Sequence, residues 1–148
     1  MNPLKNMKIR ALEKEDLGTI IEIDEKVLGE NRKDYWERKL VLMNDKSSKV
    51  SLVAEAEGKV AGFILGDVSG WEFGVPDTIG WIDTIGIDPV YQKKGLATTL
   101  AHELIKNLKA IGVRTIYTLV SWDDWDLLQF FHAMGFTRGD MINLELEI

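Results

Sequence analysis

Hydrophobic residues recur along this 148-residue chain at two different spacings, which predict helices in some segments and strands in others. In the segment 95–111, Leu96, Leu100 and Leu104 repeat at helical spacing, and Gly112 follows as a helix stop. In the segment 141–148, apolar and polar residues alternate, which is typical of a strand. Across the whole chain, the two patterns predict helices at 13–29, 32–45, 95–111 and 124–136, and strands at 7–12, 50–68 (two runs), 79–88, 113–122 and 141–148.

The order of these elements indicates an α/β fold built on a mixed sheet. Glu57 and Gly58 separate two strand runs and predict a hairpin, whose strands are antiparallel. The helix 95–111 joins the strands 79–88 and 113–122, and a crossover of this kind connects parallel strands. We therefore expect one sheet that contains both kinds of pairing.

Composition narrows the classes of function. The length fits a single domain covering residues 1–148, and 45% hydrophobic residues are enough for a core. The net charge of −6 disfavours duplex DNA and anionic membranes as partners, since both need a large basic face. The absence of cysteine excludes disulfides, zinc–thiolate sites and a cysteine nucleophile. No segment resembles a signal peptide or a membrane span, so we expect a soluble cytoplasmic protein without a metal site.

The turn between the strand 79–88 and the helix 95–111 has the features of an anion site. Pro89 ends the strand, and Gly95 lets a ligand approach the backbone because it has no Cβ. The first amides of a helix have no internal partner and carry partial positive charge. Lys93 and Lys94 add charge of the same sign. The alternative interpretation is an ordinary helix start with two solvated lysines.

The segment IGIDPVYQKKGLATTL (85–100) resembles the signature of the GNAT superfamily of N-acetyltransferases. That signature is an apolar strand followed by x-P-x-x-[QR]-x-x-G-x-[GA]. Gln92, Gly95 and Ala97 match it, with Ile87 and Pro89 at the correct spacing. The order of elements over 7–148 also fits the family.

This resemblance implies a GNAT-like fold, in which about four helices flank a mixed sheet and two splayed parallel strands form a cleft for acetyl-CoA. The helix after the signature would receive the pyrophosphate of coenzyme A on its amides, and the preceding strand would pair with the pantetheine arm. Gly86 has a structural alternative as a β-bulge. The implied cofactor-binding residues are Ile85, Gly86, Ile87, Gln92, Lys93, Lys94, Gly95, Leu96, Ala97, Thr98 and Asp124.

A second family segment is matched only in part. Within 121–136, Phe130, Gly135 and Phe136 agree, whereas Asp124 and Leu127 replace the usual Asn and Ala. Asp124 therefore has two interpretations, a cap of the helix 124–136 or a cofactor contact. Phe131 stands where many members have the tyrosine proposed as general acid, and phenylalanine has no proton to donate.

The chemistry implied is direct attack of a neutral amine on the thioester. Ile87 N–H is the family's candidate for polarising the carbonyl. Asp83, four residues earlier and hence expected on the same face, is a candidate base or substrate anchor, with a pKa that burial would raise. The alternative is that Asp83 only accepts a hydrogen bond from a neighbouring amide. Glu72 is a weaker candidate base, and we interpret His102 and His132 as structural or exposed.

We expect aromatic and acidic residues to line the acceptor pocket, since both attract an ammonium group. They are equally suited to a protein surface or a dimer contact. The candidate substrate-binding residues are Trp71, Glu72, Phe73 and Trp122, the last beside Asp123, Asp124 and Trp125.

Two functions remain in view. One is an acetyltransferase that moves an acetyl group from acetyl-CoA to a primary amine of a small molecule, peptide or protein. The other is a non-catalytic acyl-CoA-binding regulatory or sensor domain of the same fold, which the replacement of tyrosine by Phe131 favours. Dimers are common among proteins that resemble this one, so a homodimer is a further expectation.

Overall fold

The computed structural model of the chain describes residues 6–43 and 50–148. The chain divides into two compact units, one ending at Thr118 and the other covering Leu119–Ile148. The first unit contains β1 (Lys8–Ala11), η1 (Lys14–Asp16), α1 (Leu17–Leu28), α2 (Lys33–Leu42), β2 (Leu52–Ala56), β3 (Lys59–Val68), η2 (Glu72–Gly74), β4 (Ile79–Ile87), η3 (Pro89–Tyr91), α4 (Leu96–Ala110) and β5 (Thr115–Thr118). The second contains α5 (Trp125–Ala133).

The five strands form one mixed sheet in the order β1-β2-β3-β4-β5. Neighbouring strands from β1 to β4 are antiparallel, and β4 and β5 are parallel with α4 as their crossover. This confirms the predicted mixed sheet. The hairpin between β2 and β3 turns at Glu57 (φ 55°) and Gly58 (φ 78°), and two successive positive φ angles are typical of a type I′ turn.

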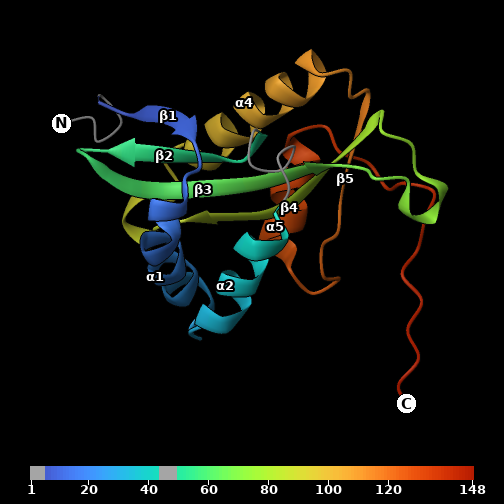
Figure 1. Ribbon diagram of the computed structural model, residues 1–148, viewed down its shortest axis with the longest axis horizontal. Helices are drawn as coiled ribbons and strands as arrows, with labels where there is room; N and C mark the ends of the chain where they lie inside the picture. Colours follow the sequence, from blue (N-terminus) through green and yellow to red (C-terminus); the bar gives the residue numbers. More distant parts are fainter. Residues whose placement is uncertain (1–5, 44–49) are drawn as a thin grey trace. The chain divides into compact units, whose positions relative to one another are not determined.

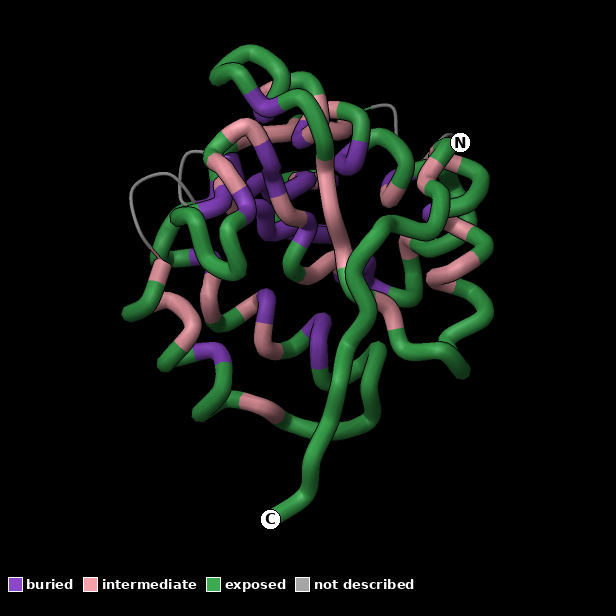
Figure 2. Tube along the Cα trace, turned by 90° about the vertical axis from the view of Figure 1, so that its right-hand side faces the viewer, coloured by how far each residue is buried: buried purple, intermediate pink, exposed green. Residues whose placement is uncertain are grey.

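Helices cover both faces of the sheet in the first unit (Figure 1). On one face, α1 and α2 bury a cluster in which the rings of Trp36 and Phe63 meet edge to face at 5.4 Å. On the other, α4 lies over β2, β3 and β4 and buries the leucine stripe predicted from the sequence. The buried residues of this unit gather between these layers (Figure 2).

Glycines let α4 approach the sheet closely. A Cβ on Gly66 of β3 would come within 2.8 Å of Leu104 Cδ1 and 3.3 Å of the Trp81 carbonyl oxygen. A Cβ on Gly80 of β4 would lie 3.1 Å from both Leu108 and Val113. The helix that follows the candidate turn therefore sits on the strand before it, with no side chain between them at these points.

The predicted strand 141–148 was wrong, because the structure has no strand there and each of these residues is exposed (Figure 2). Alternation shows which side chains could share a face, whereas a strand also needs a hydrogen-bonding partner, and none pairs with this segment among the described residues. The predicted strand 113–122 is shortened to Thr115–Thr118.

The predicted helices were confirmed with shorter ends. The first begins with the 3₁₀ turn η1 and ends at Gly29, whose φ of 77° marks the expected stop. The last two residues of the predicted helix 32–45 lie outside the described residues. Among the described helices, none combines the length and apolar character needed to cross a bilayer.

We predict that Gly66→Ala lowers the free energy of unfolding by about 1–3 kcal/mol, because its new methyl group overpacks Leu104. The matched control is Gly18→Ala, at an exposed position of α1 where a Cβ meets nothing within 4 Å. This control should raise stability by about 0.5–1 kcal/mol through helix propensity. Urea denaturation measures both variants, and equal effects at the two positions would contradict the close packing of α4.

Candidate functional site

The second half of β4 has an open edge. The parallel partner β5 pairs with β4 only from Ile79 to Ile82, and Thr118 Oγ1 closes this pairing by donating to the Ile82 carbonyl oxygen at 2.9 Å. Beyond Ile82, β4 continues to Ile87 with β3 on one side and no second strand in the described sheet.

The register shows which backbone groups face this open edge. In an antiparallel ladder, alternate residues direct their N–H and C=O groups toward the partner strand. Asp88 N–H donates to the Ala61 carbonyl at 2.9 Å, so the backbone groups of Gly86 also face β3. Those of Ile85 and Ile87 therefore point the other way, where an extended ligand could pair with them.

A β-bulge sits where the open edge begins. Leu65 of β3 pairs with Thr84 and Gly66 pairs with Ile82, so Asp83 is an extra residue on β4. A bulge shifts the alternation of side chains, and Asp83 reaches Lys39 of α2 on one face of the sheet. Ile87 Cδ1 lies on the other face, near Leu100 of α4. The expectation that Asp83 and Ile87 share a face was therefore wrong.

Gly86 is not the bulge that its sequence suggested as an alternative. A Cβ at this position would lie 2.6 Å from Cζ of Phe63, so the Phe63 ring occupies the space that a side chain would need. Gly86 thus lets the core pack directly beneath the open edge.

The turn after β4 is fixed by a buried carboxylate. Asp88 is 6% exposed, accepts from Val90 N–H at 3.1 Å and pairs with Lys26 of α1 at 3.1 Å. Burial raises the pKa of Asp88, but the Val90 amide and the Lys26 ammonium outweigh it, so the pKa lies below its ordinary value. Gln92 Nε2 donates to the Ile87 carbonyl at 3.0 Å and ties the turn to the end of β4.

Unpaired amides follow this turn, as the sequence predicted. Gly95 is the N-cap of α4 with φ 84° and no side-chain cap, and Lys93 also has a positive φ of 61°. The first hydrogen bond of the helix is Thr99 N–H to the Gly95 carbonyl at 3.0 Å. The amides of residues 93–98 donate to no group in the described parts of the chain, and residues 92–95 are exposed. This arrangement has the charge and the geometry of a candidate anion site.

Lys39 is the residue of this region that the sequence did not reveal. Its ammonium group donates to Asp83 Oδ2, and Thr84 Oγ1 donates to the other carboxylate oxygen at 2.8 Å. The two side chains of the ion pair are 25% and 31% exposed, so both are partly accessible. No local signal identifies such a pair, because its members are 44 residues apart on different elements.

The aromatic loop between β3 and β4 is not brought to the anion site. Trp71, Glu72 and Phe73 precede the first residue of β4, whereas the turn follows its last, so they lie at opposite ends of the strand (Figure 1). Trp71 and Phe73 have φ values of 74° and 54°, and Phe73 is 94% exposed. Glu72 accepts from Gly70 N–H at 2.8 Å.

In the second unit, Asp124 caps α5, with its Oδ1 accepting from Leu127 N–H at 3.1 Å. Trp122 is 83% exposed, and a shallow hollow at the start of α5 is lined by residues 123–126. Phe131 is buried against Phe130 and Phe136, with ring centroids 5.1 and 5.0 Å apart. His132 is exposed, as is His102 in the first unit, in agreement with their interpretation from the sequence.

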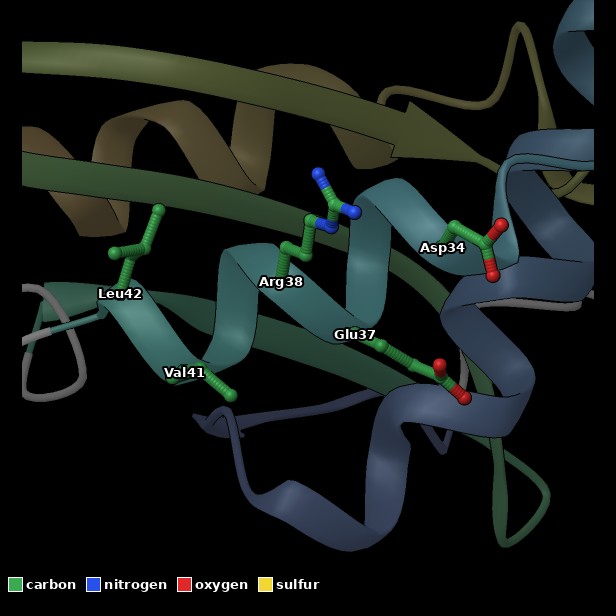
Figure 3. Close-up of a pocket in the computed structure, with 5 residues that line it drawn as sticks. All are labelled: Asp34, Glu37, Arg38, Val41 and Leu42. Atoms are coloured by element: carbon green, nitrogen blue, oxygen red, sulfur yellow. The ribbon is translucent and has the colours of Figure 1, made fainter.

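Another shallow hollow lies along α2 and contains none of the predicted site residues (Figure 3). A single helix supplies all five side chains that line it, so it has no opposing wall to enclose a small molecule. They are Asp34, Glu37, Arg38, Val41 and Leu42. We therefore place the candidate site at the open edge of β4 and the turn after it, where backbone donors are free.

Comparison with known proteins identifies the family of the chain. Residues 12–136 match the sequence model of the acetyltransferase (GNAT) family. The chain is 25% identical, over 95% of its own length, to an uncharacterised N-acetyltransferase of Methanocaldococcus jannaschii, and it spans 65% of that relative.

Solved structures share the fold. The ribosomal-protein-S18-alanine N-acetyltransferase of Escherichia coli has a TM-score of 0.75 at 21% identity, covering 90% of this chain and 79% of that one. An aminoglycoside N-acetyltransferase in complex with CoA has a TM-score of 0.75 at 18% identity, covering 96% of this chain and 95% of that one.

We predict that Asp88→Asn removes about 1 kcal/mol of stability at pH 7 and a smaller amount at pH 3. The pKa of Asp88 is lowered in the folded state, so its charge stabilises the fold above the unfolded value of about 3.9. That contribution is lost as the pH falls through the lower folded value. Asparagine keeps the acceptor for Val90 N–H and loses only the charge. Urea denaturation at both pH values measures the effect.

The control is Lys33→Met, which breaks the exposed pair of Lys33 with Glu37 (3.7 Å). An exposed pair contributes little, so this variant should change stability by less than about 0.5 kcal/mol. An equal loss for Asp88→Asn at both pH values would show that the charge of Asp88 is not what stabilises the turn.

Proposed function

Because this chain belongs to the acetyltransferase (GNAT) family, we propose that it transfers an acetyl group from acetyl-CoA to a primary amine. One observation carries the proposal. The outward amides of Ile85 and Ile87 lead directly into the unpaired amides of residues 93–98, and Gln92 joins the two sets. A ligand with an amide-bearing arm and a phosphate end matches that sequence of donors.

Coenzyme A has these two parts, and the residues present fit it. The amides from Lys93 to Thr98 would hold the pyrophosphate, and Gly95 leaves the approach open, since nothing lies within 4 Å of where its Cβ would be. The backbone of Ile85 and Ile87 would hold the pantetheine arm. When bound, acetyl-CoA supplies an acetyl thioester that an amine can attack.

Asp83 is the proposed base. It stands at the start of the open edge, and its carboxylate already hydrogen-bonds an ammonium group, that of Lys39. A base must lie within hydrogen-bond reach of the attacking amine, directly or through one water. Asp83 would take the proton that the amine must lose.

The geometry favours Ile85 N–H over Ile87 N–H as the donor that polarises the carbonyl when Asp83 is the base. Ile87 is four residues from Asp83, roughly 13 Å along a strand, and its side chain lies on the opposite face. Ile85 is two residues away, roughly 7 Å. Both groups must reach one reacting carbon, which only the nearer pair can do.

No tyrosine stands at the usual general-acid position. Phe131 is packed between two other phenylalanines and can donate no proton. We propose that the sulfur leaves as a thiolate, which is feasible because a free thiol has a pKa of about 8.5.

The acceptor remains an amine of unassigned structure. The two solved structures described above are named for different acceptors, a ribosomal-protein alanine and an aminoglycoside, so they favour neither. We also propose Trp71, Glu72, Phe73 and Trp122 as acceptor contacts, because all four are exposed and aromatic rings and a carboxylate attract an ammonium group. The family match crosses the boundary between the two compact units, which supports the proposal that they work as one domain.

A second candidate function is acyl-CoA binding without transfer, as in a sensor domain. Two observations favour it: Phe131 offers no acid, and Lys39 occupies the carboxylate of the proposed base. Thiol release from acetyl-CoA across a panel of amines separates the two candidates, since a sensor binds acetyl-CoA and releases no thiol.

We predict that Gly95→Trp reduces coenzyme A affinity at least about 100-fold, because a bulky side chain would cover the amides of the turn. The matched control is Gly112→Trp, at the far end of α4. Gly95 and Gly112 are both exposed, have positive φ (84° and 99°) and have nothing within 4 Å of an added Cβ. The two variants therefore share a backbone cost of about 1–2 kcal/mol.

Isothermal titration calorimetry with coenzyme A measures the affinities, and thermal unfolding checks the shared cost. If both variants bind coenzyme A as the unmodified chain does, the pyrophosphate is not held at this turn. Titration with ATP and NAD tests whether the turn accepts any nucleotide.

We predict that Asp83→Asn lowers the acetylation rate about 100-fold near pH 6 and progressively less toward pH 9, where more of the amine is already neutral. The control is Asp67→Asn on β3, whose Oδ1 accepts from the adjacent Val68 N–H. The effect is measured from the pH–rate profiles of the unmodified chain and of the two variants. An Asp83→Asn profile parallel to that of the unmodified chain would remove Asp83 from the role of base.

A further inference from the structure

Lys39 presents a primary amine to the proposed base. Its Nζ donates to Asp83 Oδ2, while Thr84 Oγ1 holds Oδ1 at 2.8 Å and fixes the carboxylate. An acceptor amine would have to make the same contact in order to lose its proton to Asp83. The ammonium group of this chain therefore already stands where the proposed function requires a substrate ammonium group.

The position of Asp83 along β4 also suits acetyl transfer to Lys39. Asp83 is the bulge residue, and the pairing with β5 ends one residue before it, at Ile82. Of the outward amides of Ile85 and Ile87, that of Ile85 is the nearer, roughly 7 Å further along the strand. An acetyl group whose carbonyl oxygen accepts from that amide would lie on the part of β4 next to the carboxylate that holds Lys39.

Three other lysines form ion pairs or hydrogen bonds with groups other than Asp83. Lys26 pairs with the buried Asp88, and Lys94 donates to the Val90 carbonyl within the turn. Lys33, on the same helix as Lys39, is 66% exposed and pairs with Glu37 in solvent. Among these lysines, only Lys39 meets a carboxylate of the β4 edge.

We propose that Lys39 is a self-acetylation site of this chain. The inference rests on the proposed function, since it needs acetyl-CoA as the acyl thioester. The Lys39 ammonium group gives one proton to Asp83, and the neutral Nζ attacks the thioester carbon. A C–N bond forms and the C–S bond breaks, with the sulfur leaving as a thiolate. The nitrogen loses its second proton, and the thiolate takes up one of the two protons from solvent. The products are therefore Nε-acetyl-lysine, the thiol and one released proton.

Acetylation would also change the site. The amide of acetyl-lysine carries no charge, so the ion pair with Asp83 would be lost and the carboxylate released. The reaction would stop after one acetyl group per chain, because it consumes its own acceptor. An external amine could then approach Asp83 without displacing Lys39.

The test incubates the full chain with acetyl-CoA and no added amine, and follows acetyl incorporation by mass spectrometry of the intact chain and of its peptides. We expect one acetyl group per chain, on Lys39, at least about tenfold faster than on Lys33, because the amine is held in place. The rate per chain should be unchanged when the protein is diluted, since the transfer is within one molecule.

The variants are Lys39→Arg, which keeps the positive charge but accepts no acetyl group, and Lys33→Arg as the matched control on α2. Lys39→Arg should abolish the rapid phase, and Lys33→Arg should leave it unchanged. Gly95→Trp should suppress it together with coenzyme A binding. Rapid modification that persists in a Gly95→Trp chain that no longer binds coenzyme A would reveal uncatalysed chemistry and overturn the inference.

Calorimetry with coenzyme A distinguishes a failure of self-acetylation from a failure of the proposed function. If coenzyme A binds but Lys39 reacts no faster than Lys33, self-acetylation is refuted and the proposed function stands. If coenzyme A does not bind, both fail. A rate per chain that rises with protein concentration would mean that one copy modifies another, which also overturns the inference.

Discussion

The site depends on the early end of one strand pairing. A parallel partner covers β4 only as far as Ile82, and beyond it the described sheet pairs with β4 on one side only. Backbone N–H groups that lose a strand partner must find water or a ligand. Because Ile85 and Ile87 face outward in register, the same strand offers two donors with the spacing that an extended chain requires. The bulge at Asp83 marks the start of this edge.

The turn after β4 is held to that edge by interactions outside the site. Lys26 of α1 and the Val90 amide fix Asp88, and Gln92 holds the carbonyl of Ile87. Gly66 and Gly80 allow α4 to rest on β3 and β4, which sets where its N-terminus begins. The positive end of the helix and the outward amides are thus held together by these contacts, although they belong to different elements. Rigid placement of donors is what lets a site bind without reorganising.

The sequence predicted the parts of this arrangement that local chemistry determines. The leucine stripe of α4, the stop at Pro89 and the glycine at position 95 each have a local cause, and the structure contains all three. The bulge at Asp83 and the ion pair with Lys39 depend on which residues meet across the fold, and no spacing in the chain reveals them. The strand prediction for 141–148 was wrong for a related reason, because alternation cannot supply a partner strand.

The Lys39–Asp83 pair links the two candidate functions. A cationic acceptor that approaches Asp83 must replace one ammonium group with another, so it gains little electrostatic energy while Lys39 keeps its charge. A chain in this state would hold acetyl-CoA without offering its base to an acceptor, which is how a binding domain behaves. Neutralising Lys39 would remove that competition and expose the base. Whether the chain acts as a binder or as a transferase would then depend on the charge of a single nitrogen, while the fold and the cofactor contacts stay the same.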